Sequence, residues 1–279
     1  MRRLLLACVV LAGAAGPLPC PPVSADAGSD IDDVPHVAAI VKAVLARGGH
    51  KQASPRAGTH AGAVVAPLKL EILVVGSATV FGPATGVGAE VAHKSLGAPA
   101  LQTNQNGFPW QAAKAIEAAV PGLHVDVTVV GRGGMTAGEM LPLLQQEVRR
   151  GAYRLVLWQT GTVDAVAEAS PEDFYQTLAA GADAVGAAGA DLMLIDPQYS
   201  RFLAANANLQ PYLAAFQAAA TLPGVGIFHR YDIMRDWAEN GDIDLEHAPK
   251  AERQAAAVRL HVCLGKELAK ELLSEAQEE

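Results

Sequence analysis

From residue 69 onward, short apolar runs alternate with longer segments whose apolar residues recur at helical spacing. The apolar runs are rich in Val, Ile and Leu, as buried parallel strands are. They lie at Leu70–Val75, Val125–Val130, Leu155–Gln159, Leu192–Ile195 and Gly226–Phe228. The segments between them predict helices at Trp110–Ala119, Ala137–Arg150, Pro171–Ala188 and Gln210–Thr221. Strands that alternate with helices form parallel sheets covered on both faces, so the pattern predicts a three-layer α/β/α sandwich.

Five predicted strands fit a flavodoxin-like, doubly wound parallel sheet, in which ligands bind beyond the carboxyl ends of the strands.

Local signals mark two of the helices. Ser170 precedes Pro171 and is expected to cap that helix, with Asp173 in its first turn. The last helix is expected to begin near Pro249 and to continue to the Leu272 region, over about 36 Å or more. Its apolar face is predicted at Val258, Val262, Gly265, Ala269 and Leu272.

The N-terminus has the pattern of an export signal. Arg2 and Arg3 precede the apolar run Leu4–Ala15, and Val23-Ser24-Ala25 offers small residues for cleavage. We therefore expect a signal peptide over residues 1–25 and a periplasmic or secreted protein. A membrane anchor is the alternative, but the apolar run is too short to span a bilayer. A lipoprotein signal ending at Cys20 is disfavoured because proline precedes that cysteine.

Cleavage near Ala25 would remove two of the three cysteines, Cys8 and Cys20. Only Cys263 would remain, so we expect no internal disulfide and a buried thiol in the last helix. Residues 26–68 are expected to form an N-terminal segment and linker with one short helix, Val37–Arg47. Residues 69–279 are expected to form a single domain.

Composition excludes several classes of function. The chain has 279 residues, 51% of them hydrophobic, and a net charge of −8, which disfavours nucleic acid as a partner. No segment after the signal is long and apolar enough to cross a membrane. His36, His50 and His60 lack the close spacing and nearby carboxylates of a metal site. The sequence therefore predicts no metal and no cofactor.

Four loops carry the residues best suited to chemistry, three at the carboxyl ends of predicted strands and one before the last helix. They are Gly76–Thr79, Gly131–Gly134, Gln159–Asp164 and Asp244–His247. Acyl transfer requires a nucleophile, a base oriented by a carboxylate, and hydrogen-bond donors for the oxyanion. Glycines can bring backbone N–H groups close to a reacting oxygen, and an Asp-x-x-His turn can bring carboxylate and base together.

These loops, in this order, resemble those of the SGNH (GDSL) hydrolase family over residues 70–273. The similarity is greatest to a branch of exported bacterial members that share further segments with this chain. Those segments are Trp158–Thr162, Asp196–Tyr199, Arg230–Trp237 and Cys263-Leu264. The resemblance implies the SGNH hydrolase fold and an acyl or carbohydrate ester as the small-molecule or glycan ligand.

Carried over residue by residue, the resemblance places the family nucleophile on Ala78, which has no group able to attack a carbonyl. The side-chain oxyanion donor, usually Asn, falls on Val163, which donates nothing. The backbone donor of the second loop falls on Gly133 or Gly134. The expected pocket also includes Gly76, Gly161 and Thr162.

The position of a general base stays open. In the branch this chain resembles, the histidine lies about two helical turns before the cysteine, which corresponds to Gln254 and Ala255 here. The sequence Asp244-Leu245-Glu246-His247 matches the Asp-x-x-His motif but lies further from Cys263. His247 is therefore either the base, oriented by Asp244, or a surface histidine at a helix start.

The residues favour an exported SGNH-like protein that is impaired or inactive as an esterase and binds or scaffolds at the cell envelope. A purely structural partner of a cell-envelope protein fits the sequence equally well. The alternative is an active serine ester hydrolase in which Ser77, one position early, is the nucleophile and works with Asp244 and His247. Otherwise Ser77 is a turn serine that bonds its own backbone.

Overall fold

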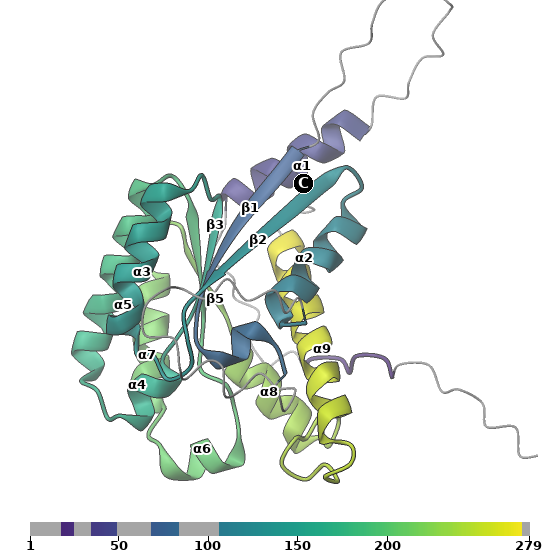
Figure 1. The fold of residues 1–279 in the computed structure, drawn as a ribbon, viewed down its shortest axis with the longest axis vertical. Coiled ribbons are helices and arrows are strands. Elements are labelled where there is room, and N and C mark those ends of the chain that lie inside the picture. The colour runs from purple at the N-terminus through teal and green to yellow at the C-terminus, as the bar shows by residue number, and fades with distance from the viewer. Residues whose placement is uncertain (1–17, 25–34, 49–67, 84–105, 275–279) are drawn as a thin grey trace, which may run out of the picture.

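Five parallel strands form the centre of the computed structural model, which describes residues 18–24, 35–48, 68–83 and 106–274 (Figure 1). The strands pair in the order β2-β1-β3-β4-β5. They are β1 (Leu68–Val75), β2 (Leu123–Val130), β3 (Leu155–Gln159), β4 (Asp191–Ile195) and β5 (Val225–Phe228). This order confirms the predicted flavodoxin-like sheet, and every strand begins and ends within two residues of its expected bounds.

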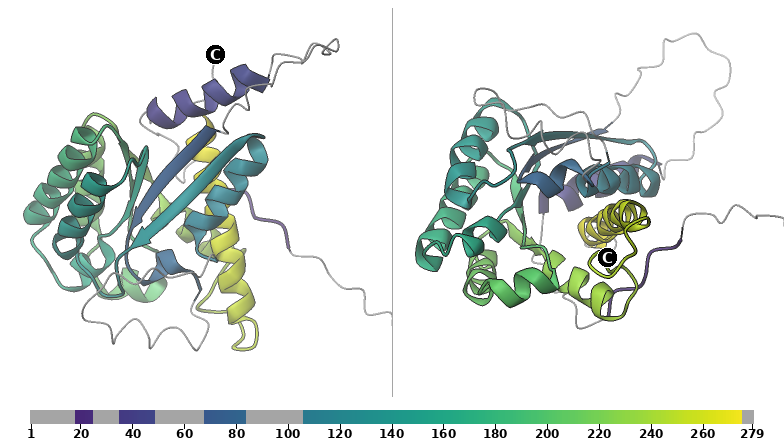
Figure 2. Two further views of the ribbon diagram at one scale, coloured as in Figure 1. Left: turned by 45° about the horizontal axis from the view of Figure 1, so that its top comes forward. Right: turned by 60° about the horizontal axis from the view of Figure 1, so that its bottom comes forward.

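Helices cover both faces of the sheet, which confirms the three-layer sandwich (Figures 1 and 2). One layer consists of α1 (Pro35–Gly48), α2 (Phe108–Ala119) and α9 (Arg253–Ser274). The other consists of α3 (Ala137–Arg150), α5 (Pro171–Ala187) and α7 (Gln210–Ala220). Residues of β1 alternate between the two cores: Ile72 and Val74 pack in the first, Leu73 and Val75 in the second. Both faces of this strand are buried, which is why its sequence is continuously apolar.

Four short helical elements were not predicted: η1 (Ala78–Phe81), α4 (Thr162–Val166), α6 (Arg201–Asn206) and α8 (Arg230–Glu239). Each follows the carboxyl end of a strand, and most are too short to show helical periodicity. The predicted cap of α5 is present, because the Ser170 hydroxyl oxygen accepts a hydrogen bond from the Asp173 amide at 3.2 Å.

The last helix differs from its prediction in two ways. α9 is continuous over 22 residues but begins at Arg253, because the residues after Pro249 form a separate turn. The predicted apolar face was right at Gly265, Ala269 and Leu272, which are buried, and wrong at Val258, which is 44% exposed. Burial begins only at Leu260, where α9 first contacts the core.

α9 and α2 approach each other closely at two residues. A Cβ added to Gly265 would lie 2.7 Å from the Phe108 carbonyl oxygen and 2.8 Å from the Ala112 nitrogen. One turn earlier, Nδ1 of buried His261 accepts a hydrogen bond from the Phe108 amide at 3.2 Å. This bond satisfies one of the N–H groups that the first turn of a helix leaves without a partner.

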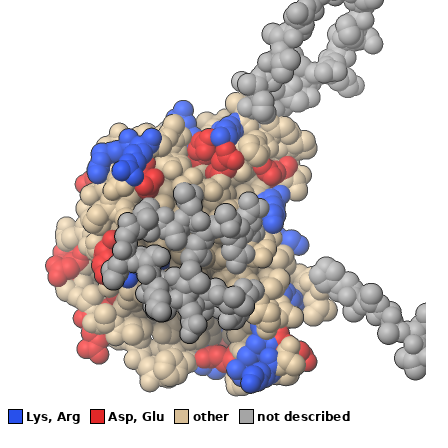
Figure 3. Space-filling model, in the orientation of Figure 1, with Lys and Arg blue, Asp and Glu red and all other residues tan. Residues whose placement is uncertain are grey.

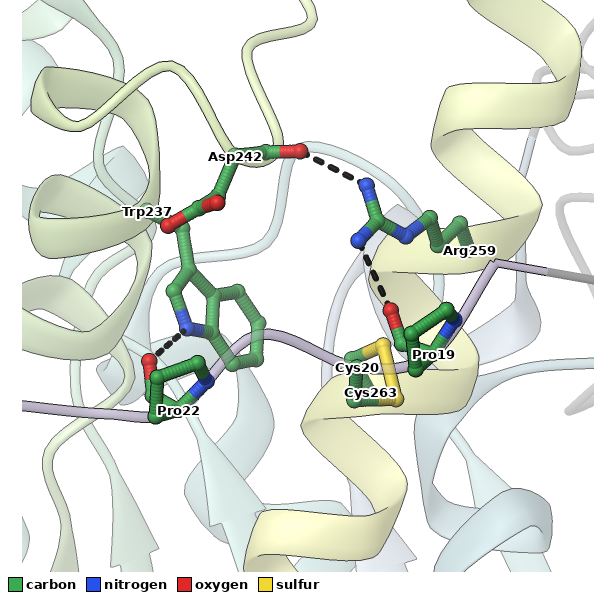
Figure 4. The surroundings of a disulfide bond; sticks show 7 residues. All are labelled: Pro19, Cys20, Pro22, Trp237, Asp242, Arg259 and Cys263. Carbon is green, nitrogen blue, oxygen red and sulfur yellow. Dashed lines mark hydrogen bonds between the residues drawn. A yellow bond between two sulfur atoms is a disulfide. The ribbon is translucent and has the colours of Figure 1, made fainter.

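Cys20 and Cys263 are joined by a disulfide (Figure 4). The expectations of no internal disulfide and of a free thiol at Cys263 were therefore wrong. Both assumed that Cys20 leaves with a cleaved signal peptide, whereas residues 18–24 lie against α8 and α9. Residues 1–17, the cleavage site at Ala25, and the linker with His50 and His60 lie outside the described residues.

The described helices include none that is long and apolar enough to cross a bilayer. Within the same ranges, no group of three or more His, Cys, Asp or Glu side chains could hold a metal ion.

The Gly265→Ala substitution should destabilise the protein by about 1–3 kcal/mol, because the added methyl group forces α9 away from the α2 backbone. Gly186→Ala in α5 is the matched control, since no atom lies within 4 Å of a Cβ there. That control should leave stability unchanged or raise it by up to about 1 kcal/mol. Urea unfolding of both variants measures the difference, and equal effects would contradict the close packing at Gly265.

Acidification from pH 6.5 to pH 4 should destabilise the fold partly through His261. Burial, together with the nearby Arg230 charge, lowers the pKa of His261 to about 4. The unfolded chain therefore binds a proton in this window that the folded chain excludes, and stability falls by up to about 3 kcal/mol. His261→Gln, which cannot titrate, should show a shallower loss of unfolding free energy over this range. An unchanged slope in the variant would show that other groups dominate.

Candidate functional site

The carboxyl ends of β1 and β2 lie against each other and bring the first two predicted loops together. The Gly76 amide donates a hydrogen bond to the Val130 carbonyl oxygen at 3.1 Å. Gly131 has a φ of +127°, and a Cβ there would overlap the Gly76 carbonyl, so the close approach requires glycine. A Cβ on Gly133 would lie 3.6 Å from the Ala78 Cβ. Of the two glycines expected to supply a backbone donor, Gly133 therefore lies next to Ala78.

We call the turn Gly76–Ala78 at the end of β1 the corner of β1. Behind this corner, four side chains form a continuous line of hydrogen bonds. Arg230 Nη1 donates to the Thr79 hydroxyl oxygen at 3.2 Å, and that hydroxyl donates to Gln159 Oε1 at 2.8 Å. Gln159 Nε2 in turn donates to Ser77 Oγ at 3.5 Å. Arg230 and Gln159 are buried, while Ser77 lies at the surface end of the line.

The direction of these hydrogen bonds follows from the chemistry of the groups. A guanidinium can only donate, so Thr79 accepts from Arg230 and directs its single proton to the Gln159 oxygen. The Gln159 amide nitrogen must then face Ser77, whose oxygen accepts.

Arg230 is a buried cation directly behind the corner. Burial lowers its pKa to about 10, so the guanidinium remains charged at neutral pH. Its Nε donates to the Asp196 carbonyl oxygen at 3.1 Å, and its Nη2 has no hydrogen-bond partner among the described residues. Burial raises the pKa of the Asp196 carboxyl to about 8, and Oδ1 of that carboxyl accepts from the Tyr231 amide. In the sequence, Asp196 and Arg230 were recognised only as parts of segments shared with the family, although Asp196 directly follows β4 and Arg230 lies two residues after β5.

The third loop is held in place by Asp164. Its buried carboxylate accepts hydrogen bonds from the Ala137 amide at 2.9 Å and from the Gly161 amide at 3.2 Å. Gly161 has a φ of +88°, which favours glycine at the start of α4. The Thr162 hydroxyl accepts from the Gln198 amide at 3.4 Å. Val163, at the position where the resemblance expects a side-chain donor for an oxyanion, has no polar side chain.

Asp244 and His247 form the predicted pair. His247 Nδ1 lies 2.7 Å from Asp244 Oδ2, and Arg201 Nη1 contacts the same oxygen at 2.7 Å. Burial alone would raise the pKa of Asp244, but hydrogen bonds from His247 and Arg201 outweigh it and lower the pKa to about 2. The Glu246 carboxylate accepts from the first two amides of α6 and ties this loop to that helix.

This pair makes no hydrogen bond to the corner of β1. Over the described ranges, the imidazole of His247 has Asp244 as its only hydrogen-bond partner, and its side chain is 71% exposed. Ser77 Oγ is bonded to Gln159 instead. Gln254 and Ala255, the alternative positions for the base, are exposed at the start of α9.

Acidic and basic side chains are interspersed over the described part of the face shown in Figure 3, without an extended basic area.

Several solved structures are similar to this chain in fold. TesA superposes with a TM-score of 0.50 and 17% identity, covering 72% of this chain and 97% of its own. A lipase/acylhydrolase from Enterococcus faecalis gives 0.50 and 14%, covering 74% and 96%. A mutant of Axe2, an acetyl-xylooligosaccharide esterase from Geobacillus stearothermophilus, gives 0.51 and 15%, covering 77% and 98%. At these identities the likeness shows the SGNH hydrolase fold.

Comparison at the level of sequence gives the family. No curated protein matches the chain significantly. The profile of the Non-GDSL lipase-like family matches residues 54–278, which is most of the chain. This match shows that the chain belongs to the Non-GDSL lipase-like family.

Proposed function

We propose that this protein is exported and binds an ester or another carbonyl-bearing ligand at the corner of β1, with little or no hydrolysis. One observation carries the proposal: the Ser77 oxygen accepts from Gln159, while the His247 imidazole pairs only with Asp244 among the described residues. A serine becomes a nucleophile when a base removes its proton. No described base is hydrogen-bonded to Ser77.

The residues at the family positions support the same conclusion. Ala78 supplies no nucleophile and Val163 supplies no side-chain donor for an oxyanion. Loss of one such donor typically lowers kcat by about 10²–10³-fold, and loss of the nucleophile removes most of the remaining rate. Without both the nucleophile and the side-chain oxyanion donor, we expect little or no ester hydrolysis at this site.

The same corner keeps groups suited to binding an oxygen acceptor. The Ser77 oxygen accepts from Gln159, which leaves its hydroxyl proton available to a ligand oxygen, and Gly133 lies next to Ala78 with its backbone N–H. The buried Arg230 cation behind them makes the corner favourable for a partial negative charge. Similar folds belong to an acylhydrolase and to an acetyl-xylooligosaccharide esterase, so acyl esters of glycans are the ligand class we propose, at the cell envelope.

An active serine ester hydrolase is the second candidate. The observation in its favour is the hydrogen bond of 2.7 Å between His247 and Asp244, which is the base–carboxylate half of a triad. It would require His247 to approach Ser77 when substrate binds.

Purified protein should hydrolyse p-nitrophenyl acetate at the buffer rate. Ala78→Ser alone should stay close to that rate, because Val163 still offers no oxyanion donor. Ala78→Ser/Val163→Asn supplies a nucleophile and a donor but no base, so it too should stay close to the buffer rate. A parent protein that turns over rapidly would contradict the proposal.

Ser77→Ala and His247→Ala should leave the background rate of the parent unchanged, because neither side chain is catalytic in our proposal. Ser77→Ala should weaken the binding of a non-hydrolysable acetamide analogue of an acetylated sugar by about 5–10-fold, since one hydrogen bond is lost. His247→Ala is the matched control and should bind normally, as measured by calorimetry. If both substitutions abolish measurable hydrolysis, Ser77 is a displaced nucleophile and the second candidate is right.

A further inference from the structure

Residues 18–24, the N-terminal strap, are attached to the folded domain by a covalent bond and several hydrogen bonds (Figure 4). Cys20 is bonded to Cys263 of α9. The Pro19 carbonyl oxygen accepts from Arg259 Nη2 at 2.7 Å, and the Pro22 carbonyl oxygen accepts from Trp237 Nε1 at 3.2 Å. The strap therefore contacts both α8 and α9.

The strap also contributes to the core. Pro21 is buried, and Cys20 and Val23 pack against the apolar cluster beneath α9. Cys263, which is bonded to Cys20, and Trp237, which donates to the Pro22 carbonyl oxygen, are fully buried. Removal of the strap would expose this cluster and leave the Trp237 indole N–H without its acceptor, which is costly for a buried donor.

These contacts lie on both sides of the loop with the Asp244–His247 pair. Trp237 and Asp236, which bonds the Ser24 hydroxyl at 2.7 Å, lie on α8 before that loop. Arg259 lies on α9 after it and also donates to the Asp242 carbonyl oxygen in the loop at 2.7 Å. The strap thus links α8 to α9, and the loop between these two helices contains the exposed His247.

We propose that the strap belongs to the mature protein: export cleavage occurs N-terminal to Cys20, and the Cys20–Cys263 bond then fixes α8 against α9 and positions the loop between them. The proposal rests on the proposed export. The sequence offers an earlier cleavage pattern, Ala12-Gly13-Ala14, near the end of the apolar run. Cleavage after Ala25 would discard the whole strap and leave Cys263 as an unpaired buried thiol.

Bond formation requires an oxidant of the compartment to which the chain is exported. The two thiols lose two protons and two electrons as the S–S bond forms, and a protein or small-molecule disulfide accepts them and becomes a dithiol. Such oxidants are present in the periplasm and outside the cell, where structural disulfides persist.

Mass spectrometry of the full chain expressed in a bacterium and recovered from its periplasm tests the cleavage position. We expect an N-terminus before Cys20 and a peptide pair linked through Cys20 and Cys263 that separates on reduction. A mature N-terminus at Asp26 with an alkylatable Cys263 would overturn this proposal and leave export intact. Intact Met1 on cytoplasmic protein would overturn export and this proposal together.

A second measurement tests the positioning role. Cys20→Ser and Cys263→Ser each remove the same bond, so each should lower Tm by about 5–15 °C, and reductant should do the same to the parent. Amide exchange over residues 240–252 should accelerate at least tenfold in Cys20→Ser, while exchange in β1 and β3 stays unchanged under native conditions. Unchanged exchange in the loop, in the variant or in the reduced parent, would show that the strap does not position it.

Discussion

Burial of both faces of the parallel sheet is the constraint on which the rest of the structure depends. A parallel strand such as β1 has no solvated side, so Ile72 and Val74 need one helical layer and Leu73 and Val75 need the other. Parallel pairing also directs every strand the same way, so the loops after β1, β2, β3 and β5 meet at one edge. The loops of the candidate site therefore lie together because the strands of the buried sheet are parallel.

At that edge, a buried cation determines the direction of the polar groups. Arg230 can only donate, so the Thr79 proton is directed to the Gln159 oxygen, and the Gln159 amide nitrogen donates to the Ser77 oxygen. Among the described residues, no base is hydrogen-bonded to this hydroxyl, and His247 pairs with Asp244 instead.

The covalent link between Cys20 and Cys263 connects the beginning of the described chain to its last helix. It lies on the same layer of helices as the contact between Gly265 and the α2 backbone. α9 is thus held on one side by close backbone packing and on the other by the strap. The loop before α9, with Asp244 and His247, is bonded to α9 through Arg259 and Asp242 and to α6 through the Arg201–Asp244 ion pair.

The sequence by itself determined the sheet, the main helices, the cap at Ser170 and the four loops, because each is encoded in local periodicity or in a few adjacent residues. It also identified the Asp244–His247 pair, whose members are three positions apart in one turn. It placed the apolar face of α9 incorrectly at Val258, since which side of a helix is buried depends on where its neighbours lie. Only the tertiary structure decided the Cys20–Cys263 bond and the line from Arg230 to Ser77, because these groups are distant in sequence and meet only after the sheet and its helices have assembled.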